Sequence, residues 1–262
     1  MKLFLTLILT FFITDTSLLY SCTEGQANRN SISNIKEITP EGSGFAVVEL
    51  FTSEGCSSCP PADELVNGLY KEAEANHSAV YFLNFHVDYW NRLGWKDPFS
   101  DKAYSERQSW YANFFGSDKI YTPQMVINGT TEFVGSSEDM ARVAIKAAIN
   151  KKASVNIKLQ KHLIQGDSIK INYEISGQTP DELLSYALIE RNLYSDIKRG
   201  ENEGRKLFHS SVVRVFEQIK SSSTGTFAIN YNLRSNDGAF EVIVFLQNKQ
   251  NGHISGANKI NF

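Results

Sequence analysis

The sequence predicts an α/β domain followed by an all-β sandwich domain. Over residues 44–152, short apolar runs rich in β-branched residues alternate with segments in which apolar residues recur every three or four positions, as in strands alternating with helices. From residue 153 onward, apolar and polar residues alternate with a period of two, and turn residues separate the runs, as in antiparallel strands. We therefore expect one domain in residues 44–152 and a second in residues 153–262.

The first domain opens with the pattern of a strand, a helix and a second strand. Residues 45–51 (FAVVELF) are an apolar run typical of a strand buried on both faces. Residues 62–76 place apolar side chains four positions apart, which predicts a helix with one apolar face. Residues 79–87 (AVYFLNFHV) predict the second strand, which should run parallel to the first in a βαβ unit.

The remainder of the first domain predicts an inserted helix, a hairpin and a final helix. The inserted helix covers about residues 100–115. Two short apolar runs follow, and Asn128 with Gly129 between them is a strong two-residue hairpin signal. Ser136 or Ser137 is expected to cap the last helix.

The second domain is expected to contain about seven short antiparallel strands. The clearest alternation covers residues 155–159, 169–175 and 240–246. Turn signals at residues 165–167 and 236–238 separate such runs. This pattern predicts the β-sandwich.

The composition excludes one large class of partner. The chain has 26 Lys plus Arg against 29 Asp plus Glu, for a net charge of −3. Proteins that bind nucleic acid usually carry a basic excess, so we expect no nucleic-acid partner. We also expect no bound cofactor.

The N-terminus has the layout of a secretory signal peptide over residues 1–21. The apolar stretch of residues 3–13 is too short to span a bilayer, which needs about 20 residues. Leu19–Cys22 (LYSC) resembles a bacterial lipobox, in which the cysteine becomes the lipid-bearing first residue of the mature protein. We therefore expect export to the cell envelope or periplasm, attachment to the membrane through a lipid on Cys22, and a flexible tether over residues 22–43.

The cysteine count links this N-terminus to a second motif. The chain has three cysteines, Cys22, Cys56 and Cys59, and an odd thiol is unusual in an exported protein. If Cys22 carries lipid, the remaining pair forms a CxxC motif. An oxidising compartment would then allow Cys56 and Cys59 to form a disulfide with each other.

The CxxC motif lies between the first predicted strand and helix, which is the context of a thioredoxin-like redox site. Unpaired N–H groups at a helix start stabilise a thiolate, and the thiolate is the nucleophile. The two prolines after the motif leave two helix starts open. Either Cys59 caps the helix and Pro60 is its first residue, or an irregular helix already begins at Cys56. In the first case the helix stabilises the thiolate of Cys56 less.

Three further residues fit a redox site. Glu49 lies in the first strand, seven positions before Cys56, and its carboxyl group could shuttle a proton to Cys59. A paired or edge-strand carboxylate is the alternative. Thr122 and Pro123 precede a strand, where a cis-proline would face the dithiol in a thioredoxin-like fold.

Four ordered blocks, ELFTSEGCSSCPPAD, HVDYWNRLGWKDPF, YTPQMVING and GENEGRKLFHSSVVR, resemble a secreted thioredoxin-like family labelled as a domain of unknown function. The first and third blocks also resemble thioredoxin-superfamily proteins in general. The resemblance runs from about residue 44 to the C-terminus. It implies a thioredoxin-like domain with Cys56 as the exposed nucleophile, Cys59 as the resolving thiol and Pro123 in cis beside them. It implies no particular substrate.

Two further groups of residues have structural alternatives. His86 and Asp88 lie at the end of a strand and could hold zinc or copper together with the CxxC motif. Because the sequence has no second CxxC and no His pair, a hydrogen-bonded structural histidine is the alternative. Arg205, His209 and Arg214 in the fourth block could meet the redox site, or could belong to a turn with solvated charges.

The leading functional hypothesis is an exported thiol–disulfide oxidoreductase that acts on protein thiols or disulfides in the cell envelope. Cys56 would attack a substrate disulfide, and Cys59 would resolve the mixed disulfide. The alternatives are a non-catalytic binding or assembly module with a structural CxxC disulfide, and a copper-binding metallochaperone. Oxidase, reductase and isomerase activities all remain open, although the negative charge of Glu54 close to Cys56 favours a reductant.

Overall fold

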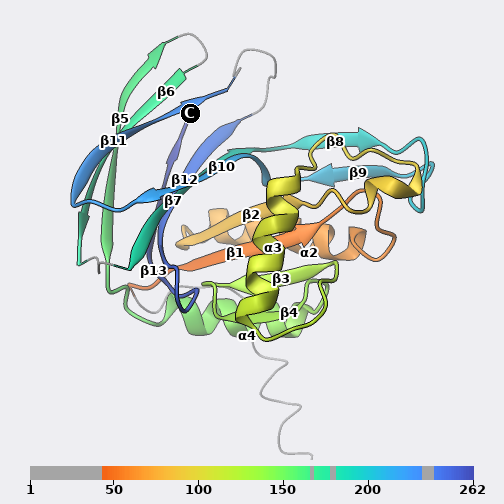
Figure 1. Cartoon of the computed structure of the whole chain (residues 1–262), viewed down its shortest axis with the longest axis horizontal. Coiled ribbons are helices and arrows are strands. Elements are labelled where there is room, and N and C mark those ends of the chain that lie inside the picture. The colour runs from red at the N-terminus through yellow and green to blue at the C-terminus, as the bar shows by residue number, and fades with distance from the viewer. Residues whose placement is uncertain (1–42, 166–167, 178–180, 232–238) are drawn as a thin grey trace, which may run out of the picture. The chain divides into compact units, whose positions relative to one another are not determined.

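The computed structural model describes residues 43–165, 168–177, 181–231 and 239–262 (Figure 1). The predicted signal peptide of residues 1–21, the lipid site Cys22 and the predicted tether up to residue 42 lie outside the described residues, as does the turn at 236–238. None of the helices in the described part of the chain has the length and apolar character needed to cross a bilayer.

The first half of the described chain alternates strands and helices. In chain order it contains β1 (Ala46–Thr52), α2 (Pro60–Ala75), β2 (Val80–His86), the 3-10 helix η2 (Asn91–Leu93), α3 (Lys102–Phe114), β3 (Gln124–Ile127), β4 (Thr131–Val134) and α4 (Glu138–Ile149).

The second half of the described chain consists of strands. They are β5 (Asn156–Gln165), β6 (Ser168–Ser176), β7 (Glu182–Glu190), β8 (Leu193–Asp196), β9 (Lys206–His209), β10 (Val212–Lys220), β11 (Thr224–Asn230), β12 (Phe240–Asn248) and β13 (Ile254–Asn261).

The local predictions of the first half agree with these elements. Strands β1 and β2 pair in parallel on either side of α2 in the sequence, as expected for a βαβ unit. The inserted helix is α3, and β3 pairs with β4 in an antiparallel hairpin whose turn holds Asn128 and Gly129 with positive φ angles. Ser137 occupies the N-cap position of α4, although its side chain makes no capping hydrogen bond.

The predicted fold class is wrong, because strands from both halves of the chain form one mixed sheet. The order of this eight-stranded sheet is β13-β12-β7-β10-β2-β1-β3-β4. The join lies between β10 and β2, where Val212 pairs with Asn84 in parallel and the Asn84 N–H donates to the Ser211 carbonyl at 2.8 Å. A thioredoxin-like domain followed by a separate sandwich therefore does not describe this architecture.

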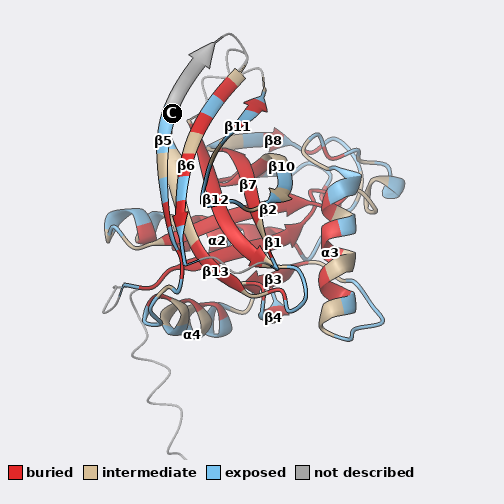
Figure 2. Ribbon diagram, turned by 60° about the vertical axis from the view of Figure 1, so that its left-hand side comes forward, coloured by how far each residue is buried: buried red, intermediate tan, exposed pale blue. Residues whose placement is uncertain are grey.

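Strand β1 is coloured as buried in Figure 2, and the side chains on its two faces belong to different parts of the core. Ala46, Val48 and Leu50 pack with α2 and α4, whereas Val47 and Phe51 pack with α3. This alternation follows from the period of two in a strand. Helices therefore cover both faces of the β1 region, which explains why β1 and β2 are buried along their whole length.

A second packing layer does exist in the second half of the chain. Strands β11, β6 and β5 form a three-stranded sheet, and its apolar side chains pack on those of β7 and β12. The predicted separate β-sandwich is therefore wrong, because the layer on which this three-stranded sheet packs is the end of the large sheet.

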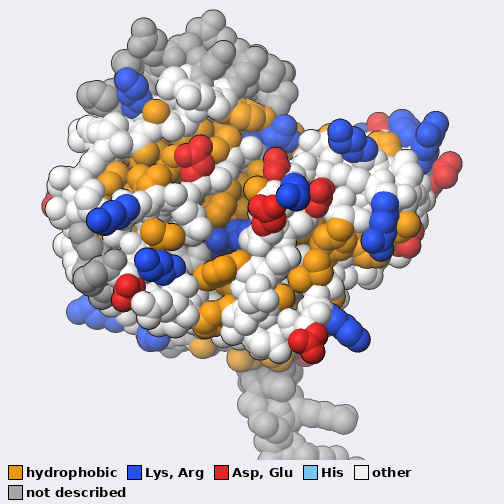
Figure 3. Space-filling model, in the orientation of Figure 1, with side chains coloured by type: hydrophobic (Ala, Val, Ile, Leu, Met, Phe, Trp, Pro, Cys, Tyr) orange, Lys and Arg blue, Asp and Glu red, His pale blue; other side chains and the backbone are white. Residues whose placement is uncertain are grey.

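The remaining two strands, β8 and β9, pair only with each other in the described structure. Strand β9 lies next to α2, and the loop that connects β8 to β9 contacts the CxxC motif. On the face drawn in Figure 3, basic side chains are interspersed with acidic ones and do not gather in a single basic patch.

Candidate functional site

Cys56 and Cys59 form the predicted disulfide, with their Cα atoms 5.4 Å apart. Cys59 is the N-cap residue of α2, and Pro60 is the first residue of the helix. The Cys59 carbonyl accepts hydrogen bonds from the N–H groups of Ala62 at 2.9 Å and Asp63 at 3.1 Å. This arrangement is the first of the two predicted helix starts, so Cys59 lies at the positive end of the helix and Cys56 lies before it.

Thr122 and Pro123 lie beside Cys56, and the peptide bond that joins them is cis. The Thr122 hydroxyl donates to Cys56 Sγ at 3.3 Å and accepts a hydrogen bond from Trp90 Nε1 at 2.8 Å. Ser58 Oγ lies 3.3 Å from the same sulfur. Of these neighbours, the Thr122–Pro123 pair was expected beside the dithiol, whereas Trp90 and Ser58 were not.

The expectation that Cys56 is exposed is wrong, since both cysteines are 0% exposed. The β8–β9 loop, residues 197–205, contacts the CxxC motif. Asn202 Nδ2 donates to the Glu54 carbonyl at 2.8 Å and to the Cys56 carbonyl at 2.9 Å, and the Ser57 N–H donates to a Glu201 carboxylate oxygen at 3.0 Å. A bulky partner can therefore reach the Cys56 sulfur only after the backbone around it moves.

Replacing Asn202 with alanine is expected to speed reduction of the disulfide by dithiothreitol about thirtyfold. The variant loses two hydrogen bonds that hold the β8–β9 loop to the CxxC backbone, each contributing about 1 kcal/mol. The rate can be followed by alkylating the freed thiols and measuring the mass of the protein. Asn258→Ala, which removes a hydrogen bond to the Ile157 carbonyl elsewhere in the fold, is the matched control. An unchanged rate for Asn202→Ala would mean that the loop does not limit access.

A buried polar cluster lies directly behind the CxxC motif. His209 Nε2 donates to Glu54 Oε1 at 3.2 Å, and His209 Nδ1 lies 3.9 Å from Asp63 Oδ1. Trp95 Nε1 also donates to Glu54, at 2.8 Å, and the Thr52 hydroxyl donates to Asp63 Oδ2 at 3.0 Å. Burial by itself lowers the pKa of His209, but the neighbouring carboxylates of Asp63 and Glu54 raise it to about 10. His209 is therefore an imidazolium at neutral pH.

His86 belongs to the same buried region and is paired with Asp97. Its Nδ1 lies 2.7 Å from Asp97 Oδ2, and its ring meets the His209 ring edge to face at 4.9 Å. Burial acts to raise the pKa of Asp97, but the charge of His86 and hydrogen bonds from His86 and from the N–H groups of Glu54 and Phe99 lower it overall. Across the described ranges, no group of three or more His, Cys, Asp or Glu side chains is placed to hold a metal ion. His86 thus has the hydrogen-bonded environment of the structural alternative.

The structure does not bring Glu49 to the disulfide, so the predicted proton shuttle is not supported. Its carboxylate accepts hydrogen bonds from Arg107 Nε at 2.5 Å, Arg107 Nη2 at 2.9 Å and Tyr111 Oη at 2.5 Å. Glu49 alternates with Val48 and Leu50 along β1 and therefore faces α3, whereas the CxxC motif lies at the start of α2 on the other face. Glu49 is therefore a buried carboxylate paired with Arg107, which was the alternative interpretation of this residue.

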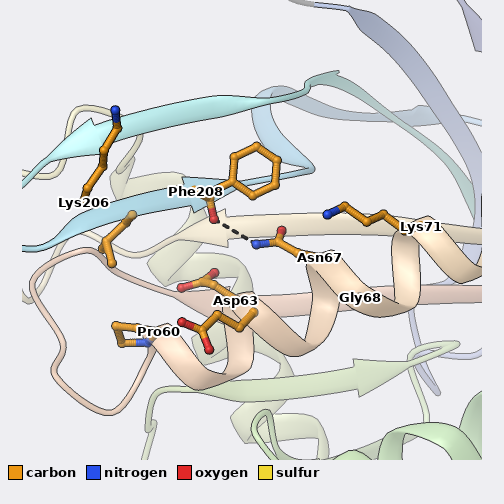
Figure 4. Close-up of a pocket in the computed structure, with 9 residues that line it drawn as sticks. Pro60, Asp63, Asn67, Gly68, Lys71, Lys206 and Phe208 are labelled. Atoms are coloured by element: carbon orange, nitrogen blue, oxygen red, sulfur yellow. Dashed lines mark hydrogen bonds between the residues drawn. The ribbon is translucent and has the colours of Figure 1, made fainter.

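A hollow of about 350 Å³ lies between α2 and β9, beside the start of the helix (Figure 4). Asn67 spans its wall by donating to the Phe208 carbonyl at 3.0 Å and accepting from the Ser210 N–H at 3.0 Å. The lining residues are Pro60, Asp63, Glu64, Asn67, Gly68, Lys71, Lys206, Leu207 and Phe208. The strand that supplies His209 thus also lines a mixed-charge hollow next to Cys59.

Sequence reasoning found only part of this site. Arg205 and His209 do lie at the site, since Arg205 donates to Asn202 Oδ1 at 3.0 Å. Arg214 does not contact the CxxC motif: its Nε lies 3.4 Å from Glu190, and its guanidinium group lies 5.2 Å from the centre of the Phe99 ring, which packs against His209. Asn202 and Asp63 were missed. Only their positions in the sequence could have indicated that they belong to the site. Asn202 lies in the block GENEGRKLFHSSVVR, and Asp63 lies one helical turn after Cys59.

The fold and the site define a mixed α/β protein in which a buried CxxC disulfide marks the start of a helix against one large sheet. The chain belongs to the family described as a protein of unknown function (DUF1223), which it matches over residues 47–247. This result confirms the predicted relationship to a family of unknown function. A comparison with curated proteins finds no match.

Two of the solved structures with a similar fold come from Agrobacterium tumefaciens and Porphyromonas gingivalis. The Agrobacterium tumefaciens protein AGR_C_4864 is 27% identical, with a TM-score of 0.61 over 82% of this chain and 93% of that one. HBP35 of Porphyromonas gingivalis is 13% identical, with a TM-score of 0.60 over 86% of this chain and 77% of that one. The second likeness concerns the fold alone.

Proposed function

We propose that this protein is an exported thiol–disulfide oxidoreductase that exchanges disulfides with proteins of the cell envelope. The observation that carries the proposal is the Cys56–Cys59 disulfide at the start of α2, with Cys59 at the N-cap and the Thr122 hydroxyl donating to Cys56 Sγ. The helix end favours negative charge on a released sulfur, and a hydrogen bond to Cys56 Sγ does the same for its thiolate.

The exchange proceeds through a mixed disulfide. In the reducing direction, the Cys56 thiolate attacks a substrate disulfide, so that a Cys56–substrate bond forms and one substrate thiolate leaves. The Cys59 thiolate then attacks the Cys56 sulfur, which restores the intramolecular disulfide and releases the second substrate thiolate. Two electrons pass to the substrate, and its two thiolates take up two protons. The reverse sequence oxidises a substrate dithiol. In both directions the β8–β9 loop has to open before the substrate sulfur reaches Cys56.

A Cys59→Ser variant of the full chain is expected to accumulate covalent adducts with partner proteins in cells. Because the resolving thiol is absent, the mixed disulfide on Cys56 persists. The adducts should appear as high-mass bands that a reductant removes, after thiols are blocked by acid and alkylation at harvest. The double variant Cys56→Ser/Cys59→Ser is the matched control. If Cys59→Ser gives no adduct beyond this control under any growth condition that keeps it folded, the oxidoreductase proposal fails.

The burial of both cysteines favours a second candidate, a non-catalytic binding or assembly module whose disulfide is structural. Such a disulfide stabilises the fold by restricting the unfolded chain. Resistance of the folded protein to a large excess of dithiothreitol, together with an unchanged phenotype of Cys56→Ala, would favour this candidate over the first.

The location in the envelope rests on the signal-peptide and lipobox pattern of residues 1–22. In this proposal Cys22 carries the lipid that anchors the protein to a membrane, and protein thiols or disulfides of the same compartment are the partners. An oxidising compartment is consistent with the Cys56–Cys59 disulfide.

A further inference from the structure

Trp90 is placed to control the hydrogen bond that the Thr122 hydroxyl makes to the CxxC disulfide. Its indole Nε1 donates to Thr122 Oγ1 at 2.8 Å, and Thr122 Oγ1 donates to Cys56 Sγ at 3.3 Å. An indole N–H can only donate, and a threonine hydroxyl carries a single proton. The hydroxyl therefore accepts from Trp90, and its own proton is left for the sulfur.

The backbone around Trp90 fixes its position beside the motif. The Trp90 carbonyl accepts from the Leu93 N–H at 3.0 Å, in the short helix η2. A Cβ atom at Gly55 would lie 3.3 Å from Trp90 Cβ, which is closer than two carbon atoms normally approach. The glycine that precedes Cys56 therefore allows the tryptophan to pack directly against the CxxC motif.

Two other hydroxyl groups lie near this pair of hydrogen bonds. Ser58 Oγ lies 3.3 Å from Cys56 Sγ, but it also donates to the Thr122 carbonyl at 3.4 Å. The Tyr89 hydroxyl donates to Gln108 Oε1 at 3.1 Å. Burial raises the pKa of Tyr89, and its interaction with the Thr122 side chain acts in the opposite direction. Tyr89 Oη is therefore an alternative acceptor for the Thr122 proton, so the direction of that proton matters.

The carboxylates close to the motif cannot supply a hydrogen bond to the sulfur. Glu201 accepts from the Ser57 N–H at 3.0 Å, and Glu54 accepts from His209 Nε2 at 3.2 Å. An ionised carboxylate only accepts hydrogen bonds, and its charge disfavours a thiolate nearby. Stabilisation of a Cys56 thiolate by the described side chains therefore depends on the hydroxyl donors.

We propose that Trp90 is a positioning residue that directs the Thr122 hydroxyl proton at Cys56 Sγ and thereby stabilises the Cys56 thiolate of the reduced protein. The inference rests on the proposed function, in which this thiolate attacks a substrate disulfide. Hydrogen bonds in a chain polarise one another, so the Trp90 N–H strengthens the bond that Thr122 donates. That bond is stronger to a thiolate than to a disulfide sulfur, because the thiolate is charged. Trp90 therefore favours the dithiol over the disulfide.

The test is the equilibrium of the Cys56–Cys59 pair with glutathione at pH 7, approached from both the oxidised and the reduced protein. One glutathione disulfide takes two electrons from the dithiol and leaves as two glutathione thiols, so the fraction of protein disulfide gives the equilibrium constant. Acid quenching, alkylation and the mass of the peptide that holds both cysteines measure this fraction. Trp90→Phe should shift the equilibrium about threefold toward the disulfide, and Thr122→Val about tenfold.

A double-mutant cycle separates this role of Trp90 from a structural one. If Trp90 acts through the Thr122 hydroxyl, Trp90→Phe should change the equilibrium less than about 1.5-fold in a Thr122→Val background. An equal shift in both backgrounds would overturn the proposal, because Trp90 would then act independently of the hydroxyl. An unchanged equilibrium in either single variant would also overturn it, so one folded variant is enough for a decision.

Tyr89→Phe is the matched control, because it removes a hydroxyl group next to Thr122 from an aromatic side chain. The variant keeps the Trp90–Thr122 and Thr122–Cys56 hydrogen bonds, so the equilibrium should not move toward the disulfide. A shift toward the disulfide as large as that of Trp90→Phe would contradict the proposal, since altered packing would then explain both results.

The outcome does not depend on a disulfide-exchange partner in cells. If the cycle shows the expected coupling but Cys59→Ser traps no partner, the role of Trp90 is kept and the oxidoreductase proposal fails. If partners are trapped but the effects of the two variants are independent, the oxidoreductase proposal is kept and the role of Trp90 is rejected. A pair that does not exchange with glutathione from either side would reject both.

Discussion

Replacing Arg107 with leucine is expected to lower the free energy of unfolding by about 3–5 kcal/mol. The guanidinium group holds the Glu49 carboxylate in the core, and both side chains are at most 5% exposed. It also donates to Gln247 Oε1 at 3.1 Å and lies 4.4 Å from the centre of the Phe216 ring. Loss of the cation leaves a buried carboxylate without its counter-ion, which is the costly way to break a buried ion pair. Urea unfolding monitored by circular dichroism measures the change.

Two controls separate the ion pair from the loss of packing. The double variant Glu49→Gln/Arg107→Leu should recover a large part of the stability, because no unpaired charge remains in the core. Arg142→Leu removes an arginine whose ion pairs with Glu72 and Glu138 are partly exposed, and should cost about 1 kcal/mol. Equal losses for Arg107→Leu and Arg142→Leu would contradict the assigned importance of the buried pair.

Stability is expected to fall by a few kcal/mol between about pH 6.5 and pH 10 because of His209. Burial alone would lower its pKa, but Asp63 and Glu54 raise it from 6.5 to about 10 in the folded protein. The folded state therefore binds this proton more tightly than the unfolded state. The contribution is complete below pH 6.5, where both states are protonated, and it disappears as the pH rises through the folded pKa. Urea unfolding at a series of pH values, with the disulfide intact, measures the slope.

His209→Gln should flatten this slope, since glutamine does not titrate. His253→Gln is the matched control, because burial lowers the pKa of His253 and the side chain is already neutral above pH 6.5. A slope that persists unchanged in His209→Gln would show that other groups carry the pH dependence.

Most individual elements could be read from the sequence, but the way they join could not. Hydrophobic periodicity depends on burial of each residue's own side chain, so it locates α3, the β3–β4 hairpin and the strands of the second half. It says nothing about which strand lies next to β2. That pairing is made by backbone atoms at Ser211 and Asn84, which leave no pattern in the side chains. The sequence therefore predicts a separate sandwich from residue 153 onward, although several of its strands belong to the large sheet.

The candidate site, like the fold, could be predicted from the sequence only in part. The disulfide follows from the spacing of the two cysteines, whereas the place of Thr122 next to Cys56 was expected only from the position of a Thr–Pro pair in a thioredoxin-like fold. The misplacement of Glu49 had a different cause. Its position along β1 puts it on the face of Val47 and Phe51, but the sequence does not say which face of β1 receives α2. His209 lies 155 residues from Glu54, and only the folded chain shows that the two side chains meet.

The disulfide can become buried only after the β8–β9 loop has been synthesised, because contacts from this loop enclose it. Asn202, which holds the β8–β9 loop against the CxxC motif, lies 146 residues along the chain from Cys56, so a growing polypeptide carries Cys56 and Cys59 long before this loop has been made. During that interval both thiols are open to any oxidant or thiol reagent, and afterwards both are shielded. The rate at which a thiol reagent modifies these two cysteines therefore distinguishes a chain that is still being synthesised from one that is complete and folded.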